Sequence, residues 1–128
     1  MMKDDKRDLL VAAARILLCV ATLFILYEAT IKQPMEVHLE NGDKLLHALA
    51  FLALGFLVDF AFPDSGYGIR KVLPLMALGI LIELVQSFLP WRSADIMDFL
   101  ADCLGVGAYW VSWPILRKIP LFRRRWAG

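Results

Sequence analysis

The residues of this chain that could carry chemistry are ionisable and amide side chains set in otherwise apolar sequence. They are Lys44, His47, Glu83, Gln86, Arg92, Asp95, Asp98 and Asp102. An ionised group at the centre of a membrane helix costs about 2.5–3.5 kcal/mol on insertion scales, so such groups usually serve a function. Imidazole can exchange protons near neutral pH, guanidinium and ammonium groups can hold phosphate, and carboxylates can act as bases. We therefore predict that these residues form one polar site.

Composition predicts an integral membrane protein. The chain is 59% hydrophobic with a mean hydropathy of +0.60, well above the roughly 45–50% apolar content of soluble domains. Its 128 residues allow a single domain, 1–128. Cys19 and Cys103 both lie in apolar runs, so neither a disulfide nor a cysteine-bound metal is predicted.

Four apolar runs predict an all-α fold, an integral membrane four-helix bundle. The predicted helices cover about 9–27, 45–62, 72–89 and 95–116, each close to the roughly 20 residues that span a bilayer core. The first is predicted to be a retained anchor. It is longer than the roughly 7–15 apolar residues of a cleaved signal peptide, and no small-x-small cleavage site follows it.

Basic residues predict the orientation in the membrane. They gather in the first eight residues, in the 63–71 segment and in the tail 117–128, whereas the segments 28–44 and 90–95 hold few. Because cytoplasmic segments carry an excess of Lys and Arg, both termini are predicted to be cytoplasmic, with a multi-pass chain in the cytoplasmic membrane. The basic tail is expected to contact anionic inner-leaflet lipid, with no nucleic acid as partner.

Helical spacing gathers the polar residues on single helix faces at the outer side. Lys44 and His47 are three apart, as are Glu83 and Gln86, while Asp95, Asp98 and Asp102 follow at intervals of three and four. Residues at these intervals share one face. The three faces are predicted to turn inward, because polar groups left unsatisfied in lipid are costly. Arg92 lies in the link between the third and fourth helices.

Other charged residues have predicted structural roles. Asp43 is placed to cap the second helix, where its carboxylate would accept from free backbone N–H groups. Arg15 and Asp59 lie toward the opposite side of the membrane. They are expected to pair with each other or with Arg70 or Lys71.

Two stretches carry a family resemblance. They are D-K-L-L-H-A-L-A-F-L-A-L-G, from Asp43 to Gly55, and E-L-V-Q-S-F-L-P-W-R-S-A-D-I-M-D-F-L-A-D-C-L-G, from Glu83 to Gly105. Together they resemble the VanZ-like family of small bacterial integral membrane proteins, whose pattern is D-K-x-x-H-x-x-x-F, E-x-x-Q, P-x-R, then spaced acidic residues, an Asn and a Gly. The matching residues are Asp43, Lys44, His47, Phe51, Glu83, Gln86, Pro90, Arg92, Asp98 and Gly105. Asp102 stands where members often carry Asn. The founding member is associated with low-level teicoplanin resistance, so the resemblance implies a membrane fold and a cell-envelope theme.

The first hypothesis is a site that binds or processes an anionic lipid or envelope precursor at the outer leaflet, linked to glycopeptide tolerance. The candidate catalytic residues are His47 as acid or base, Glu83 as a base or as a group orienting His47, and Asp98. The candidate substrate-binding residues are Lys44, Gln86, Arg92, Asp95 and Asp102. Lys44 and Arg92 would hold phosphate, whereas Asp98 and Asp102 would hold a cation or substrate hydroxyls. No cofactor is predicted.

Three alternatives remain open. A metal-dependent membrane enzyme could use His47, Glu83, Asp98 and Asp102 as ligands, but no H-E-x-x-H motif is present and Lys and Arg lie nearby, so no metal is assigned. A non-enzymatic protein could use the polar residues as a helix-packing network, although interhelical hydrogen bonds in membranes contribute only about 0.6–2 kcal/mol each. A proton-coupled carrier would need polar groups on the inner half beyond Arg15 and Asp59. Homo-oligomerisation is also left open.

Overall fold

The structure is a computed structural model of the 128-residue chain, and it describes residues 2–32, 34, 36 and 38–120. Its elements are four α-helices: α1 (Met2–Thr30), α2 (Gly42–Ala61), α3 (Ile69–Ser87) and α4 (Ile96–Leu116). No strand is present in the described ranges. The prediction of an all-α chain with four helices is therefore confirmed. The predicted tail beyond 120, with Arg123, Arg124 and Arg125, lies outside the described residues.

Three predicted helix starts need correction, and α3 begins at Ile69 rather than near residue 72. The first helix begins at Met2 rather than near residue 9, because the boundary between charged and apolar sequence does not end a helix. The N-cap of α2 is Asn41, in the left-handed conformation with φ 56°, and its side chain makes no capping hydrogen bond. Asp43 lies instead in the first turn of α2, where its charge complements the helix dipole. The fourth helix begins as predicted, with Asp95 at its N-cap.

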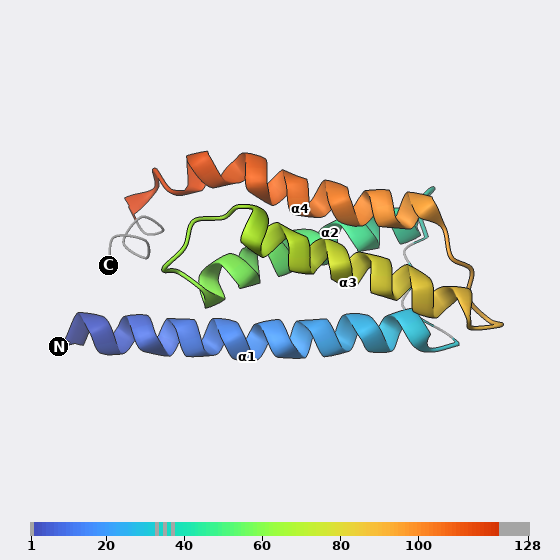
Figure 1. Ribbon diagram of the computed structural model, residues 1–128, viewed down its shortest axis with the longest axis horizontal. Helices are drawn as coiled ribbons and strands as arrows, with labels where there is room; N and C mark the ends of the chain where they lie inside the picture. Colours follow the sequence, from blue (N-terminus) through green and yellow to red (C-terminus); the bar gives the residue numbers. More distant parts are fainter. Residues whose placement is uncertain (1, 33, 35, 37, 121–128) are drawn as a thin grey trace.

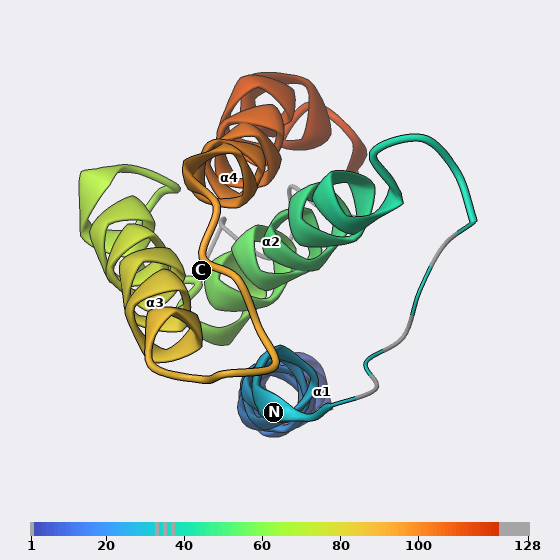
Figure 2. The same cartoon turned by 90° about the vertical axis from the view of Figure 1, so that its right-hand side faces the viewer.

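Helix α2 contacts each of the other three helices, and its contact with α4 is the most extensive (Figure 2). Close approach of α2 and α4 depends on Gly105. A Cβ at this position would collide with the Ala48 carbonyl oxygen and lie 2.8 Å from the Leu52 nitrogen. The glycine that ends the predicted motif is therefore explained by backbone contact between two helices.

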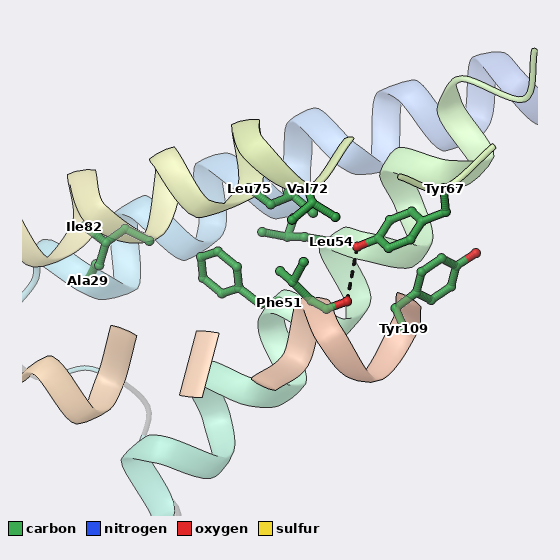
Figure 3. Close-up of a cluster of buried hydrophobic side chains, with 9 residues drawn as sticks. Ala29, Phe51, Leu54, Tyr67, Val72, Leu75, Ile82 and Tyr109 are labelled. Carbon is green, nitrogen blue, oxygen red and sulfur yellow. Dashed lines mark hydrogen bonds between the residues drawn. The ribbon is translucent and has the colours of Figure 1, made fainter. Parts of the chain in front are cut away.

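The buried core lies between the helices and joins all four (Figure 3). Its buried members are Ala29, Phe51, Leu54, Tyr67, Val72, Leu75, Ile82, Val106 and Tyr109. Tyr67 comes from the α2–α3 connection and donates a hydrogen bond of 3.3 Å to the Val106 carbonyl of α4 (Figure 3). This core fixes the relative positions of the elements that carry the polar residues.

Large apolar side chains cover the outside of the helices, as expected of a protein solvated by lipid. Three segments are long and apolar enough to cross a membrane: Asp5–Thr30, Gly42–Ala61 and Ile96–Leu116. Helix α3 does not meet the same criterion, because its 19 residues include Arg70, Lys71 and Glu83. The start of α1, the α2–α3 connection and the end of α4 lie at one end of the bundle, and the other two connections lie at the opposite end (Figure 1).

The charged residues away from the predicted site make structural contacts. Asp59 is fully buried and pairs with Lys71 at 2.8 Å, one of the pairings predicted for it. Lys71 also donates to the carbonyl oxygens of Phe62 and Ser65, at 2.8 and 2.7 Å, and so holds the α2–α3 turn. Arg15 does not pair with Asp59: its Nε donates to the Ala61 carbonyl at 3.0 Å.

Candidate functional site

The candidate site lies at the end of the bundle formed by the 31–41 and 88–95 connections (Figure 1). The first turns of α2, the last turns of α3 and the first turns of α4 converge there. Contacts join six of the eight predicted residues: Lys44, His47, Glu83, Asp95, Asp98 and Asp102. We call these six residues and Asp43 the polar cluster. Gln86 and Arg92 lie apart from it.

Lys44 is the cation of the polar cluster. Its Nζ lies 3.3 Å from Asp43 Oδ2 and 3.2 Å from Asp95 Oδ2, and 3.6 Å from Asp98 Oδ1. The last distance is too long for a hydrogen bond but short enough for charge attraction. Lys44 therefore links the first turn of α2 to the start of α4.

His47 faces two carboxylates of α4. Its Nδ1 lies 2.7 Å from Asp102 Oδ1, a hydrogen bond in which the ring N–H donates to the carboxylate. Its Nε2 lies 3.8 Å from Asp98 Oδ2. Asp102 is 1% exposed and Asp98 is 7% exposed, so both carboxylates are buried. The His47 ring, which is less buried, lies against both of them. This arrangement orients the ring toward α4.

Glu83 and Asp95 fasten α3 to the start of α4. The Asp95 backbone N–H donates to Glu83 Oε2 at 3.0 Å, while the Asp95 carboxylate accepts from the Met97 backbone N–H at 2.9 Å. The Met97 N–H and then the Lys44 ammonium hold the pKa of Asp95 below its ordinary value. Asp95 is therefore an ionised helix cap beside Lys44.

Gln86 and Trp91 tie the end of α3 to α1. Gln86 is 2% exposed, and its Nε2 donates to the Ala29 carbonyl at 3.2 Å. Trp91 Nε1 donates to the Thr30 carbonyl at 2.8 Å. These contacts hold the end of α1 against the end of α3 and the connection that follows it. Gln86, which was predicted to bind substrate, therefore has a packing contact that the sequence did not indicate.

A cavity of about 440 Å³ lies between α1, α2, α3 and the 31–41 connection. Of the predicted residues, His47, Gln86 and Arg92 line it, as does Asp43. Arg92 is half-buried, and its side chain forms no ion pair with any residue that the structure describes. His47 thus belongs to both the polar cluster and the cavity wall.

Sequence reasoning missed one wall of the cavity. Apolar and acidic residues of α1 and the following connection form it: Phe24, Ile25, Glu28, Glu36 and Leu39. The first apolar run gave no signal of an inward face, because it is apolar all round. The acidic residues at its end and beyond were the available signal, since Glu28 and Glu36 both line the cavity.

Four buried oxygen atoms at this end accept no hydrogen bond from the described residues: Glu83 Oε1, Gln86 Oε1, Asp98 Oδ1 and Asp102 Oδ2. Buried polar atoms in native structures are almost always paired. A network built only for packing would satisfy them, because an unpaired buried acceptor costs about 1–3 kcal/mol. The unpaired oxygens therefore leave hydrogen-bonding capacity at this end of the bundle.

With this geometry in place, the family comparison is decisive. The model of the VanZ/LLP1 family matches residues 9–117. The chain belongs to the VanZ/LLP1 family. The match extends from α1 to just past α4 and confirms the resemblance seen in the motifs. No curated protein and no solved structure matches the chain.

Proposed function

We propose that this VanZ-like protein binds or processes an anionic lipid or lipid-linked envelope precursor at the outer side of the cytoplasmic membrane. The main support is the cavity of about 440 Å³, which is lined in part by His47 of the polar cluster. Apolar residues such as Phe24 and Ile82 line part of it. Another part is lined by polar residues: Glu28, Glu36, Asp43, Gln86 and Arg92. A cavity with both kinds of wall suits an amphiphile.

The roles of the residues follow from their contacts. Arg92 lines the cavity without a carboxylate partner among the described residues, so its guanidinium is free to hold a phosphate in two hydrogen bonds. His47 is oriented by Asp102 and faces Asp98, which suits an acid or base. Lys44, by contrast, is engaged by Asp43 and Asp95 and positions the cluster.

The proposal includes a membrane arrangement. All four helices cross the bilayer, the cavity end faces outward, and both termini lie in the cytoplasm. The alternation of the connections between the two ends of the bundle supports four crossings (Figure 1), and the distribution of basic residues supports the orientation. The whole chain, 1–128, acts as one domain, and protection of an envelope precursor would link it to glycopeptide tolerance.

The test is lipid retention by the full-length protein in neutral-lipid nanodiscs doped with anionic phospholipid or an undecaprenyl phosphate. We expect His47→Ala and Arg92→Ala each to reduce bound anionic lipid by at least about tenfold, since loss of a charge-assisted contact costs roughly 1.5–3 kcal/mol. Arg70→Ala is the matched control, because Arg70 is exposed at the opposite end of the bundle. Native mass spectrometry measures the bound lipid. Unchanged lipid binding in both cavity variants at normal protein levels would refute the proposal.

A second candidate function is helix packing without a ligand. It is favoured by the interhelical contacts of Lys44 with Asp95, Glu83 with the Asp95 backbone, and Gln86 with Ala29. This function predicts that the charge-swapped pair Lys44→Asp with Asp95→Lys restores both folding and glycopeptide tolerance. The proposed ligand site also predicts restored folding in the charge-swapped protein. It predicts in addition that Arg92→Ala in that protein abolishes glycopeptide tolerance, measured by growth in teicoplanin.

A further inference from the structure

Three residues of the polar cluster meet from three different helices. His47 of α2, Glu83 of α3 and Asp102 of α4 each offer one ligand atom, and these atoms all lie within 4.8 Å of one another. Two ligand atoms of one ion, each about 2.0–2.2 Å from it, lie at most about 4.4 Å apart, so a small side-chain movement would bring all three atoms onto one ion. No two of these residues are close in sequence, so the convergence is a product of the fold.

The charge of the cluster is unbalanced. The carboxylates of Asp43, Glu83, Asp95, Asp98 and Asp102 gather there. Within the described part of the chain, Lys44 is the only lysine or arginine within 4 Å of any of them. An anionic headgroup approaching this cluster would meet net negative charge, which opposes binding. A bound divalent cation would reduce this opposition.

The unpaired oxygens lie on the same residues. Asp102 is 1% exposed, and its Oδ2 accepts no hydrogen bond from the described residues, as is also true of Glu83 Oε1. Gly79 leaves room for Asp102, because a Cβ there would lie 3.0 Å from Oδ2. A buried carboxylate oxygen without a partner is costly unless a cation neutralises it.

We propose that His47, Glu83 and Asp102 bind a divalent transition-metal ion of the Zn²⁺ or Mn²⁺ class. One imidazole with two carboxylates suits these ions, whereas sites for Ca²⁺ and Mg²⁺ are built from oxygen ligands. Three protein ligands leave a coordination position open. The metal site stands by itself, but its role rests on the proposed function: the open position would take a phosphate oxygen of the headgroup, with Arg92 supplying the second contact.

The metal alone tests the site. The full-length protein in phosphatidylcholine nanodiscs is treated with a chelator, then titrated with Mn²⁺ by electron paramagnetic resonance and with Zn²⁺ by calorimetry. We expect one ion per chain, with affinity at least about tenfold weaker in Glu83→Gln and Asp102→Asn, as for other losses around metal sites. Asp95→Asn is the matched control, since it removes one charge from the cluster and Asn retains the helix cap. The proposed site is overturned if the wild-type protein does not bind one metal ion per chain. It is also overturned if Glu83→Gln, Asp102→Asn and Asp95→Asn lose metal affinity equally.

A second measurement covers variants that fail to fold. X-ray absorption of the zinc-loaded wild-type protein should show one imidazole nitrogen among oxygen ligands, and a shell without nitrogen overturns the proposal. Anionic lipid binding is then measured with and without the ion. Metal binding without any lipid binding leaves the site standing and refutes the proposed function. Lipid binding by protein that takes up no metal refutes the site alone.

Discussion

At the scale of single residues, two buried aspartates have opposite surroundings. Asp59 is 0% exposed and is satisfied on both oxygens, by Lys71 at 2.8 Å and by the Tyr109 hydroxyl, which donates to it. Asp102 is 1% exposed but has an unpaired oxygen and a histidine partner. The contacts of Asp59 offset the cost of removing its charge from water and so hold the fold together. Asp102, by contrast, keeps one oxygen that can accept a contact from a ligand.

Removal of Lys71 tests the structural role of the Asp59 contact. Lys71→Met leaves a fully buried carboxylate without its cation, and breaking such a pair typically costs about 3–5 kcal/mol. We expect a loss of this size in the free energy of unfolding, measured by denaturant titration in detergent micelles. Arg70→Met removes the neighbouring exposed charge and should change it by less than about 0.5 kcal/mol. A Lys71→Met protein as stable as the wild type would contradict the assignment.

At the scale of helices, the crossing of α2 and α4 decides how closely His47 can approach Asp102. Gly105 allows that crossing, since its position faces the backbone of Ala48 and Leu52. Gly107 lies half a turn away on the same helix, and a Cβ there would meet nothing within 4 Å. One helix therefore contains two glycines, of which only the first is required by packing.

Substitution of the two glycines separates these roles. Gly105→Ala should push α2 and α4 apart and cost about 1–3 kcal/mol, as overpacking does. Gly107→Ala should be neutral or stabilising by up to about 1 kcal/mol, since Gly loses more conformational freedom in a helix. Unfolding in detergent measures both. Equal effects of the two substitutions would show that the crossing does not depend on Gly105.

At the scale of the whole molecule, the sequence predicts features with helical periodicity, but it does not predict most contacts between different helices. Apolar length and i,i+3 spacing identified four helices and placed His47 and Asp102 on facing sides. The same patterns could not show that Gln86 reaches α1 or that Arg92 lines a cavity without joining the ion pairs of the polar cluster, because both depend on the path of connections without periodicity. The wall supplied by α1 was hidden for a similar reason, since a helix that is apolar all round shows no inward face.

The membrane arrangement is the prediction that concerns the whole molecule. In a background with Cys19→Ala and Cys103→Ala, we expect Leu39→Cys to react with a membrane-impermeant maleimide in intact cells, because the proposed arrangement places the 31–41 connection outside. Ser65→Cys, in the α2–α3 connection, should react only after the membrane is opened. Both Leu39 and Ser65 are exposed, so reaction depends on sidedness rather than burial. The reverse pattern would place the polar cluster at the cytoplasmic face, and labelling of both positions from outside would show that α2 does not cross the bilayer.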